Sequence, residues 1–227
     1  MALVQDKEAD PFSAADLRRR ARGVLISPEQ RISRTHDAPS VCSEFELNPE
    51  LEALTQGVHE RPAAVLIAVF ERGGCASILF TQRSEHLTAH AGQISFPGGK
   101  MEPGDANLAE TALREAREEI GLAPEYIEMV GFLDDYIIST GYRISPLVAI
   151  LRKGYSLNPD RNEVSEIFDV PLSHLMNAQN YEMHTREFRG AKRLFYAIPC
   201  GNRFIWGATA AMLRNLYHGL YVTDSNS

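Results

Sequence analysis

Residues 98–122 read GGKMEPGDANLAETALREAREEIGL, and this stretch decides how the rest of the chain is interpreted. Its second part has helical periodicity, which predicts a helix from Asp105 to Ile120 that ends at Gly121. Carboxylates three or four residues apart repel each other on a helix, so an acidic run here raises the question of a compensating cation. The predicted helix contains four glutamates, Glu110, Glu115, Glu118 and Glu119.

Three of these glutamates share one face of the predicted helix. Glu115 lies three residues before Glu118 and four before Glu119, and side chains at these spacings have Cβ atoms about 5–6 Å apart. Hard cations such as Mg²⁺ take oxygen ligands and leave their other positions to water and substrate phosphate. The spacing by itself therefore leaves two interpretations, a magnesium site and an ordinary exposed acidic helix surface.

The glycine-rich run before the predicted helix is not a P-loop. That motif requires a glycine five residues before Gly99 and a serine or threonine after Lys100, whereas the chain has Ile94 and Met101 at these positions. The sequence around Ser95 also lacks the G-x-S-x-G pattern of a serine hydrolase. Neither nucleotide binding by a P-loop nor serine catalysis is supported.

The stretch resembles the Nudix box, the family pattern G-x5-E-x7-R-E-U-x-E-E-x-G-U in which U is bulky and apolar. Two substitutions depart from the pattern, because Asp105 stands at the first glutamate and the small Ala116 fills an apolar position. In addition, eight residues rather than seven separate Asp105 from Arg114. The fixed positions that match are Gly99, Arg114, Glu115, Glu118, Glu119, Gly121 and Leu122.

This resemblance implies a metal site with Mg²⁺ or Mn²⁺ as the cofactor. It implies that Glu115, Glu118 and Glu119 are the metal ligands and that the Gly99 region shapes the loop against the helix. Arg114 lies four residues before Glu118, so it could orient that carboxylate and also offset the helix repulsion. Glu110 is an alternative to Asp105 as the first acid.

Residues 79–99 resemble a second, longer signature, L-L-T-x-R-S-x3-R-x3-G-x3-F-P-G-G, which marks the coenzyme A diphosphatase branch of the Nudix hydrolases. The chain has LFTQRS at 79–84, Gly92, and FPGG at 96–99. Thr88 stands where the signature has arginine. The longer box and the segment WGATA at 206–210 are further habits of that branch, and the similarity covers about residues 62–216.

The resemblance implies hydrolysis of the pyrophosphate of coenzyme A or its derivatives to 3′,5′-ADP and 4′-phosphopantetheine. Arg83 is the best candidate for a phosphate contact, because a guanidinium binds phosphate in a bidentate way. An ordinary surface ion pair is the alternative for Arg83. The expected substrate-binding residues are Arg83, Ser84, Gly98, Gly99 and Lys100.

Members of this family usually receive a further acid from a distal loop. The segment NPDRNEVSEIF at 158–168 offers Glu163 first and Glu166 second, as a metal ligand or as the general base. The expected catalytic residues are therefore Glu118, Glu119, Glu115, Arg114 and Glu163.

Two other functions stay open at this point. One is a Nudix hydrolase of another nucleoside diphosphate derivative, such as ADP-ribose or NADH. The other is a binding or regulatory module without catalysis, although such modules tend to lose the acids that this chain retains.

Composition excludes several classes of partner. A formal net charge of −7 over 227 residues argues against general nucleic-acid binding, which requires a basic face. The longest apolar run, Ala63–Phe70, is too short to cross a bilayer. An acidic N-terminus without a secretory pattern and three widely spaced cysteines favour a cytoplasmic protein. The expected partner is a small molecule, and the oligomeric state, a homodimer included, stays open.

The order of elements predicts an α+β fold, and the resemblance implies the Nudix fold with a mixed β-sheet sandwiched between α-helices. Strands are expected in PAAVLIAVF and ASILFTQR, joined by a Gly73-Gly74 turn, and at 126–133, 144–151, 181–188 and 193–199. A last helix is expected from about Trp206 to Gly219. Its apolar stripe, whose residues recur at spacings of three and four, is expected to pack in the core and consists of Trp206, Ala210, Leu213, Tyr217 and Leu220. The expected parts are an N-terminal extension at 1–60 with a short arginine-rich helix at 13–23, a Nudix domain at 61–220, and a tail at 221–227.

Overall fold

The computed structural model describes residues 10–33, 42–52, 59–86, 90–188 and 191–222. Thr88 and residues 223–227 of the expected tail lie outside these ranges. The described helices are α1 (Ala14–Ala21), α2 (Pro28–Ser33), α4 (Leu108–Ile120), α5 (Leu172–Leu175) and α6 (Ala208–Leu220).

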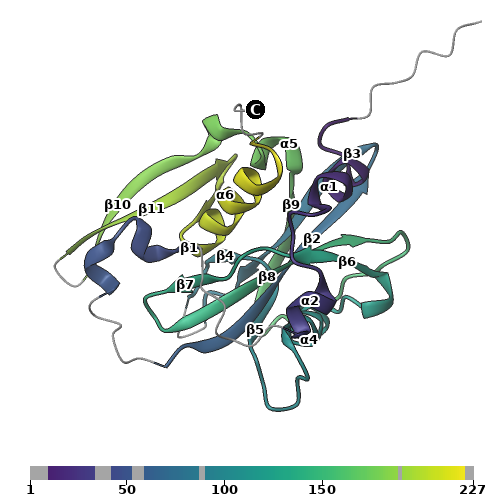
Figure 1. Ribbon diagram of the computed structural model, residues 1–227, viewed down its shortest axis with the longest axis horizontal. Coiled ribbons are helices and arrows are strands. Elements are labelled where there is room, and N and C mark those ends of the chain that lie inside the picture. Colours follow the sequence, from purple (N-terminus) through teal and green to yellow (C-terminus); the bar gives the residue numbers. More distant parts are fainter. Residues whose placement is uncertain (1–9, 34–41, 53–58, 87–89, 189–190, 223–227) are drawn as a thin grey trace, which may run out of the picture.

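The strands form two sheets, shown in Figure 1. The larger sheet contains β1 (Cys42–Ser43), β2 (Arg61–Arg72), β3 (Cys75–Arg83), β4 (Ile94–Ser95), β5 (Gly98–Lys100), β6 (Ile127–Phe132), β7 (Tyr136–Ile138), β8 (Tyr142–Leu151) and β9 (Val164–Pro171). The smaller sheet contains β10 (Glu182–Phe188), β11 (Ala191–Cys200) and β12 (Arg203–Trp206).

The central strand β2 explains why the larger sheet is mixed. It runs parallel to β8 and antiparallel to β3 and β5. The turn to β3 is made by Gly73 and Gly74, whose φ angles of 62° and 88° suit the tight hairpin turn that two glycines favour. The hairpin prediction is confirmed.

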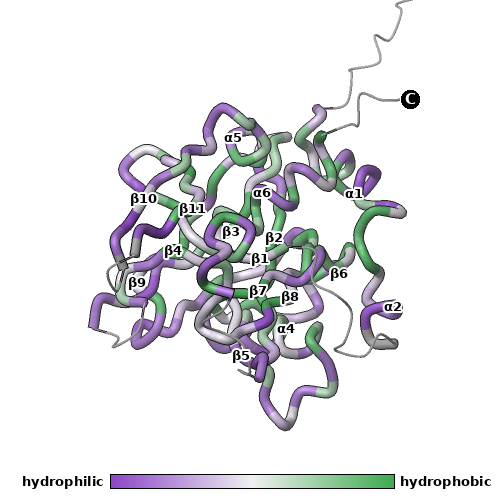
Figure 2. The backbone as a smooth tube through the Cα atoms, turned by 60° about the vertical axis from the view of Figure 1, so that its left-hand side comes forward, coloured by the Kyte–Doolittle hydropathy of each residue, from purple (hydrophilic) through white to green (hydrophobic). Residues whose placement is uncertain are grey.

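Both faces of β2 are buried, which is why its sequence is a continuous apolar run. Alternate residues enter two separate cores, with Leu66 and Ala68 in one and Ile67 and Val69 in the other. Figure 2 shows hydrophobic stretches of β2 and β8 in the interior of the molecule.

Helices cover both faces of the larger sheet. Residues of α1, α5 and α6 pack into the core on one face, and residues of α4 pack into the core on the other. Figure 1 shows α6 and α4 on opposite sides of β2 and β8. The predicted α+β fold with a mixed sheet between helices is confirmed. Among the described helices, none combines the length and the apolar character that a membrane crossing requires.

The acidic helix begins at Leu108 rather than at the predicted Asp105. Asn107 is the N-cap, since its side-chain oxygen accepts hydrogen bonds from the N–H groups of Ala109 and Glu110 at 3.0 Å each. The carboxylate of Glu110 accepts from the N–H of Ala106, the residue before the cap. The sequence carries this signal as N-x-x-E. The predicted end is correct, because Gly121 adopts a left-handed φ of 68°.

The last helix also begins later than predicted. Trp206 ends β12, and Gly207, with φ of 65°, separates that strand from α6. The Trp206 ring packs against Phe195 of the neighbouring β11 and not on the helix stripe to which its spacing assigned it. Ala210 and Leu213 of that stripe are buried as predicted.

Several described contacts attach the N-terminal segment to the larger sheet, among them the pairing of β1 with β7 and the bridge between Ile26 and Phe132. Leu17 of α1 is fully buried in the core, and Arg18 pairs with Glu128 of β6 at 2.9 Å. Arg31 of α2 pairs with the buried Asp135 at 2.6 Å. The arginines of α1 therefore make specific ion pairs and do not form a purely solvated face.

Candidate active site

Arg114 is the centre of the acidic cluster on α4. Its Nη1 donates to Glu115 and to Glu118 at 2.9 Å each, which neutralises two carboxylates that would otherwise repel each other. Its Nη2 also donates to the backbone carbonyl of Lys100 at 3.1 Å. The predicted contact between Arg114 and Glu118 is present, and Glu115 shares it.

Asp105 holds the other side of the same guanidinium. Its two carboxylate oxygens accept from Nε and Nη2 of Arg114 at 2.9 and 3.0 Å. The hydroxyl of Thr111 and the N–H of Glu102 also donate to Asp105, at 3.0 and 2.9 Å. The Arg114 hydrogen bonds lower the pKa of Asp105 to about 2, against the opposing effect of burial. Asp105 therefore supports Arg114 from the position of the first acid, whereas Glu110 accepts only from the N–H of Ala106, before the helix.

Glu119 is the most deeply buried acid of the cluster, at 5% exposed. One of its oxygens accepts from the N–H of Gly98 at 3.2 Å, and the other lies 3.6 Å from Nη1 of Arg83. Burial raises the pKa of Glu119 to about 8, and the nearby charges of Glu115 and Glu163 act in the same direction. Gly98 and Arg83 oppose the shift.

The two glycines of β5 allow the strand to approach its neighbours closely. A Cβ at Gly99 would lie 2.4 Å from a carboxylate oxygen of Glu115. A Cβ at Gly98 would lie 2.4 Å from the backbone oxygen of Ala64 on β2. At Gly98 the obstacle is backbone, so only glycine fits, and its N–H donates to Glu119. A side chain at Gly99 would displace the carboxylate of Glu115.

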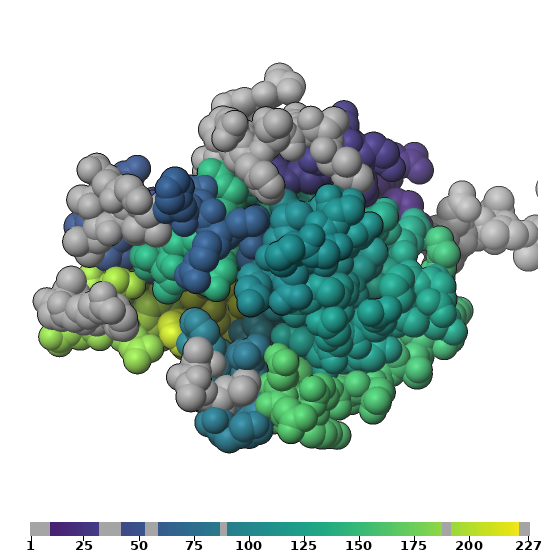
Figure 3. All heavy atoms as spheres, turned by 90° about the horizontal axis from the view of Figure 1, so that it is seen from below, coloured from purple at the N-terminus to yellow at the C-terminus, as the bar shows by residue number. Residues whose placement is uncertain are grey.

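The distal loop brings Glu163 to this cluster. The N–H groups of Asn158 and Asp160 donate to the carbonyls of Ile120 and Glu119 at 2.8 and 2.9 Å, so the loop covers the C-terminal end of α4. Figure 3 shows the green segment of this region lying against the teal segment that includes α4. Glu163 is close enough to raise the pKa values of both Glu115 and Glu119.

Glu166 is directed elsewhere. It lies on β9, opposite Gln82, and its carboxylate pairs with Arg203 of β12. Of the two acids that the sequence offered, the structure brings Glu163 and not Glu166 to the acids of α4.

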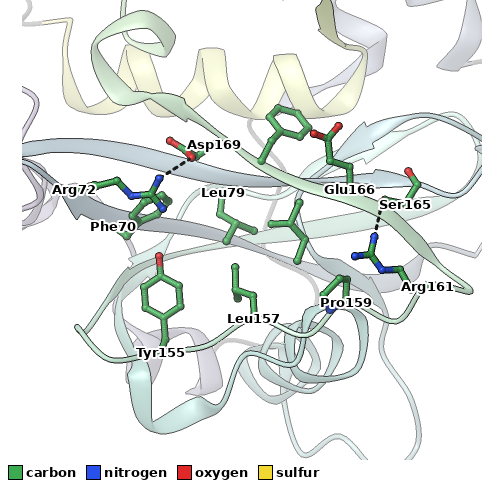
Figure 4. Close-up of a pocket in the computed structure, with 12 residues that line it drawn as sticks. Phe70, Arg72, Leu79, Tyr155, Leu157, Pro159, Arg161, Ser165, Glu166 and Asp169 are labelled. Atoms are coloured by element: carbon green, nitrogen blue, oxygen red, sulfur yellow. Dashed lines mark hydrogen bonds and ion pairs between the residues drawn. The ribbon is translucent and has the colours of Figure 1, made fainter.

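A groove of about 350 Å³ lies beside the distal loop (Figure 4). Phe70 and Leu79 form part of its apolar floor, and Tyr155, Leu157 and Pro159 form the wall on the loop side. Arg161 closes one end, where its Nη1 donates to the backbone oxygen of Ser165 at 2.9 Å. The groove therefore borders the turn that carries Glu163, and none of the α4 acids lines it.

The remaining predicted substrate residues differ in exposure. The side chain of Lys100 is exposed, which leaves its ammonium group accessible to an anionic ligand. Its Nζ lies 3.9 Å from Oε1 of Glu102. Ser84 is only 3% exposed, and its contacts are with residues of the distal loop. A direct substrate contact by the Ser84 side chain therefore does not agree with its burial. Arg83 is partly exposed, and its Nε has no hydrogen-bond partner among the described residues.

The chemistry of the acids fits a hard divalent cation. Glu115 and Glu119 have raised pKa values because they are buried close to other carboxylates, and a divalent ion would neutralise this concentration of negative charge. In the described part of the chain, no three acidic, histidine or cysteine side chains are already gathered around one point. Arg114 holds the carboxylates of Glu115 and Glu118, and the N–H of Gly98 holds that of Glu119.

Sequence reasoning missed the contacts that hold this site together. Thr111 is fully buried on α4 and donates to Asp105, a role that a polar residue among apolar helix positions could have indicated. The capping of α4 by Asn158 and Asp160 uses backbone groups, and the sequence gives no signal for it.

The chain is similar in sequence to members of a known family. The model of the family described as NUDIX domain matches residues 60–194. A protein of Citrobacter koseri, "Uncharacterized Nudix hydrolase NudL", is 36% identical over 170 residues, which cover 75% of this chain and 87% of that protein. An Escherichia coli protein of the same name is 35% identical over the same length. Among solved structures, an Ap4A hydrolase of C. elegans aligns with 50% of this chain and 81% of its own, at 19% identity and a TM-score of 0.41.

Proposed function

Because this chain belongs to the Nudix hydrolase family, we propose that it hydrolyses the pyrophosphate of coenzyme A or its derivatives, with Mg²⁺ or Mn²⁺ as the cofactor. The products are 3′,5′-ADP and 4′-phosphopantetheine, or the acylated form of the latter. The substrate is a small molecule, and we expect the protein to act in the cytoplasm.

The acids of α4 and the distal loop have separate roles in this proposal. Glu115, Glu118 and Glu119 would hold the metal, and a divalent ion there would supply a water of lowered pKa and positive charge beside the phosphate oxygens. Arg114 orients Glu115 and Glu118 through Nη1, while Asp105 fixes the opposite side of the guanidinium.

Glu163 is the general base or a further ligand. Its support is the proximity to Glu115 and Glu119, and Glu166 is occupied by Arg203. At its place beside these acids, Glu163 can accept a proton from the attacking water.

The observation that carries the coenzyme A proposal is the position of Arg83 in the signature LFTQRS. Its guanidinium lies 3.6 Å from the predicted metal ligand Glu119, and its buried Nε has no described partner, so it can receive a phosphate at the edge of the metal site. Gly98 and Gly99 let the backbone approach the same phosphates, and Lys100 adds a second cation nearby.

The test is a substrate panel with Mg²⁺ and with Mn²⁺, in which kcat/KM is measured and the products are identified. We expect coenzyme A and its short acyl or oxidised forms to be hydrolysed more efficiently than ADP-ribose, NADH or dephospho-coenzyme A. A charge-assisted contact to the 3′-phosphate contributes about 1.5–3 kcal/mol, so dephospho-coenzyme A should be about ten- to a hundredfold poorer. Thr88, at the arginine position of the signature, would reduce this ratio.

Two results would contradict the proposal in different ways. If ADP-ribose or NADH were the best substrate, the protein would still be a Nudix hydrolase, but the coenzyme A assignment would be wrong. No hydrolysis of any member of the panel with either metal would instead favour a binding module without catalysis.

A further inference from the structure

Ser84 occupies the place where β3 ends and the distal loop begins to pair with it. The register between β3 and β9 shifts at Gln82 and Arg83, so the chain after β3 turns toward the loop. The N–H of Ser84 donates to the backbone oxygen of Glu163 at 2.8 Å, and its Oγ donates to the backbone oxygen of Arg161 at 3.3 Å. Two hydrogen bonds from one buried residue thus hold both sides of the turn that carries the distal acid.

The same turn is held on its other side by α4. The N–H of Asp160 donates to the carbonyl of Glu119, and the N–H of Glu163 donates to the carbonyl of Asp160 at 3.0 Å. The backbone of Glu163 is therefore fixed between the end of α4 and the end of β3. The contact with α4 is made by the backbone alone, whereas the contact with β3 depends in part on the hydroxyl of Ser84.

Arg83, the neighbour of Ser84, contacts the buried acid Glu119 of α4. Its guanidinium lies 3.6 Å from Glu119 while the backbone and side chain of Ser84 hold the turn at Arg161 and Glu163. Arg83 and Ser84, at the end of β3, thus contact an acid of α4 and the backbone of the turn that carries the distal acid.

We propose that Ser84 is a positioning residue that sets the place of Glu163 relative to Glu119 through the hydrogen bond to Arg161. This inference rests on the proposed function, since it gives the distal acid its place in that reaction. The serine of the LFTQRS run would then position the turn that carries Glu163 and would not contact the substrate.

The effect expected from Ser84→Ala follows from what the hydroxyl does. Its removal leaves the backbone oxygen of Arg161 without this donor, while the N–H of Ser84 still bonds Glu163. The turn then shifts without unfolding. Displacement of a reacting group by as much as 1 Å can cost about 100-fold in rate, and a partial shift should lower kcat by about tenfold. KM should stay unchanged, because Ser84 does not touch the substrate.

The test combines kinetics of Ser84→Ala, Glu163→Gln and the double variant, measured on the best diphosphate substrate with saturating Mg²⁺. If Ser84 acts through Glu163, the double variant should be no slower than Glu163→Gln alone. Ser84→Cys, which keeps the shape but offers only a weak S–H donor, should also lose activity. Ser165→Ala is the matched control, because its hydroxyl joins the same two strands by donating to the oxygen of Gln82 at 3.0 Å. The control should keep the wild-type kcat.

Several results would overturn the inference. An unchanged kcat in Ser84→Ala or Ser84→Cys would do so, as would a raised KM at constant kcat, which indicates a substrate contact. Equal losses in Ser84→Ala and Ser165→Ala, or multiplied losses in the double variant, would indicate a general structural role. A wild-type enzyme without diphosphatase activity, or a fully active Glu163→Gln, would instead refute the proposed function, and the positioning role would fail with it.

Discussion

Asp105→Asn tests whether the aspartate at the first acid position of the box maintains the site. The carboxylate accepts four hydrogen bonds, two from Arg114, one from Thr111 and one from the N–H of Glu102. Asparagine keeps the shape, but it loses the charge and turns an NH₂ group toward at least one of these donors. Arg114 retains its contacts with two glutamates, so the loss is that of charge-assisted hydrogen bonds and not of a wholly orphaned charge.

The expected loss is about 1.5–3 kcal/mol in the free energy of unfolding at pH 7. For a chain of this length it corresponds to about 3–12 °C in Tm. Urea unfolding should show a lower midpoint at an unchanged m value. The matched control is Glu110→Gln, since Glu110 is exposed and accepts from the N–H of Ala106 only. It should cost about 1 kcal/mol at most, as an ordinary cap does.

The pH dependence gives a second measurement of the same contact. Hydrogen bonds from Arg114 hold the pKa of Asp105 at about 2, below its usual value of 3.8. A carboxyl whose pKa is lower in the folded state adds stability that is complete above its unfolded pKa and is lost as the pH falls through the folded value. The difference in stability between wild type and Asp105→Asn should therefore be constant above about pH 4 and shrink between about pH 4 and 2. Equal unfolding of the two proteins at pH 7, or a difference that persists unchanged at low pH, would refute this account of Asp105.

Three further variants test the acids and the loop. Glu118→Gln should lower kcat about 100-fold or more at saturating Mg²⁺, because a proposed anionic ligand is removed. The Tm without metal should stay equal or rise, because repulsion on the helix is reduced. A near-normal rate would show that Glu118 is not a metal ligand. Glu163→Gln should lower kcat more than Glu166→Gln, and the reverse order in steady-state kinetics would transfer the role of distal acid to Glu166. Gly99→Ala should lose most of the activity, because its Cβ would displace the carboxylate of Glu115, a proposed metal ligand. Gly104→Ala, where a Cβ meets nothing within 4 Å, is the control for thermal unfolding and activity.

Features that depend on neighbouring residues could be predicted from the amino-acid sequence. The continuous apolar run of β2, the glycine pair that turns it into β3, and the spacing of the glutamates on α4 are local patterns, and the structure agrees with each. The helix start was misplaced by three residues, although its signal, Asn107 with Glu110, is also local. The box pattern gave the family, which the match over residues 60–194 confirms.

Which distant residues meet depends on the tertiary packing of the whole chain. Glu163 and Glu166 are equivalent in sequence terms, but residues 158–160 cap α4 and bring Glu163 to the acids, whereas β9 carries Glu166 to Arg203. Trp206 continued a helical spacing, yet it pairs in β12 because strand hydrogen bonds to β11 satisfy its backbone.

Ser84 is an example of a residue whose surroundings depend on the packing of distant segments. Its neighbours in sequence suggest a residue that faces the substrate, but its hydrogen-bond partners lie in residues 161–163, brought to it by the pairing of β3 with β9. Helical and strand spacings are set by the backbone geometry of a few consecutive residues. Contacts between segments this far apart depend on how the whole chain packs, and no local pattern records them.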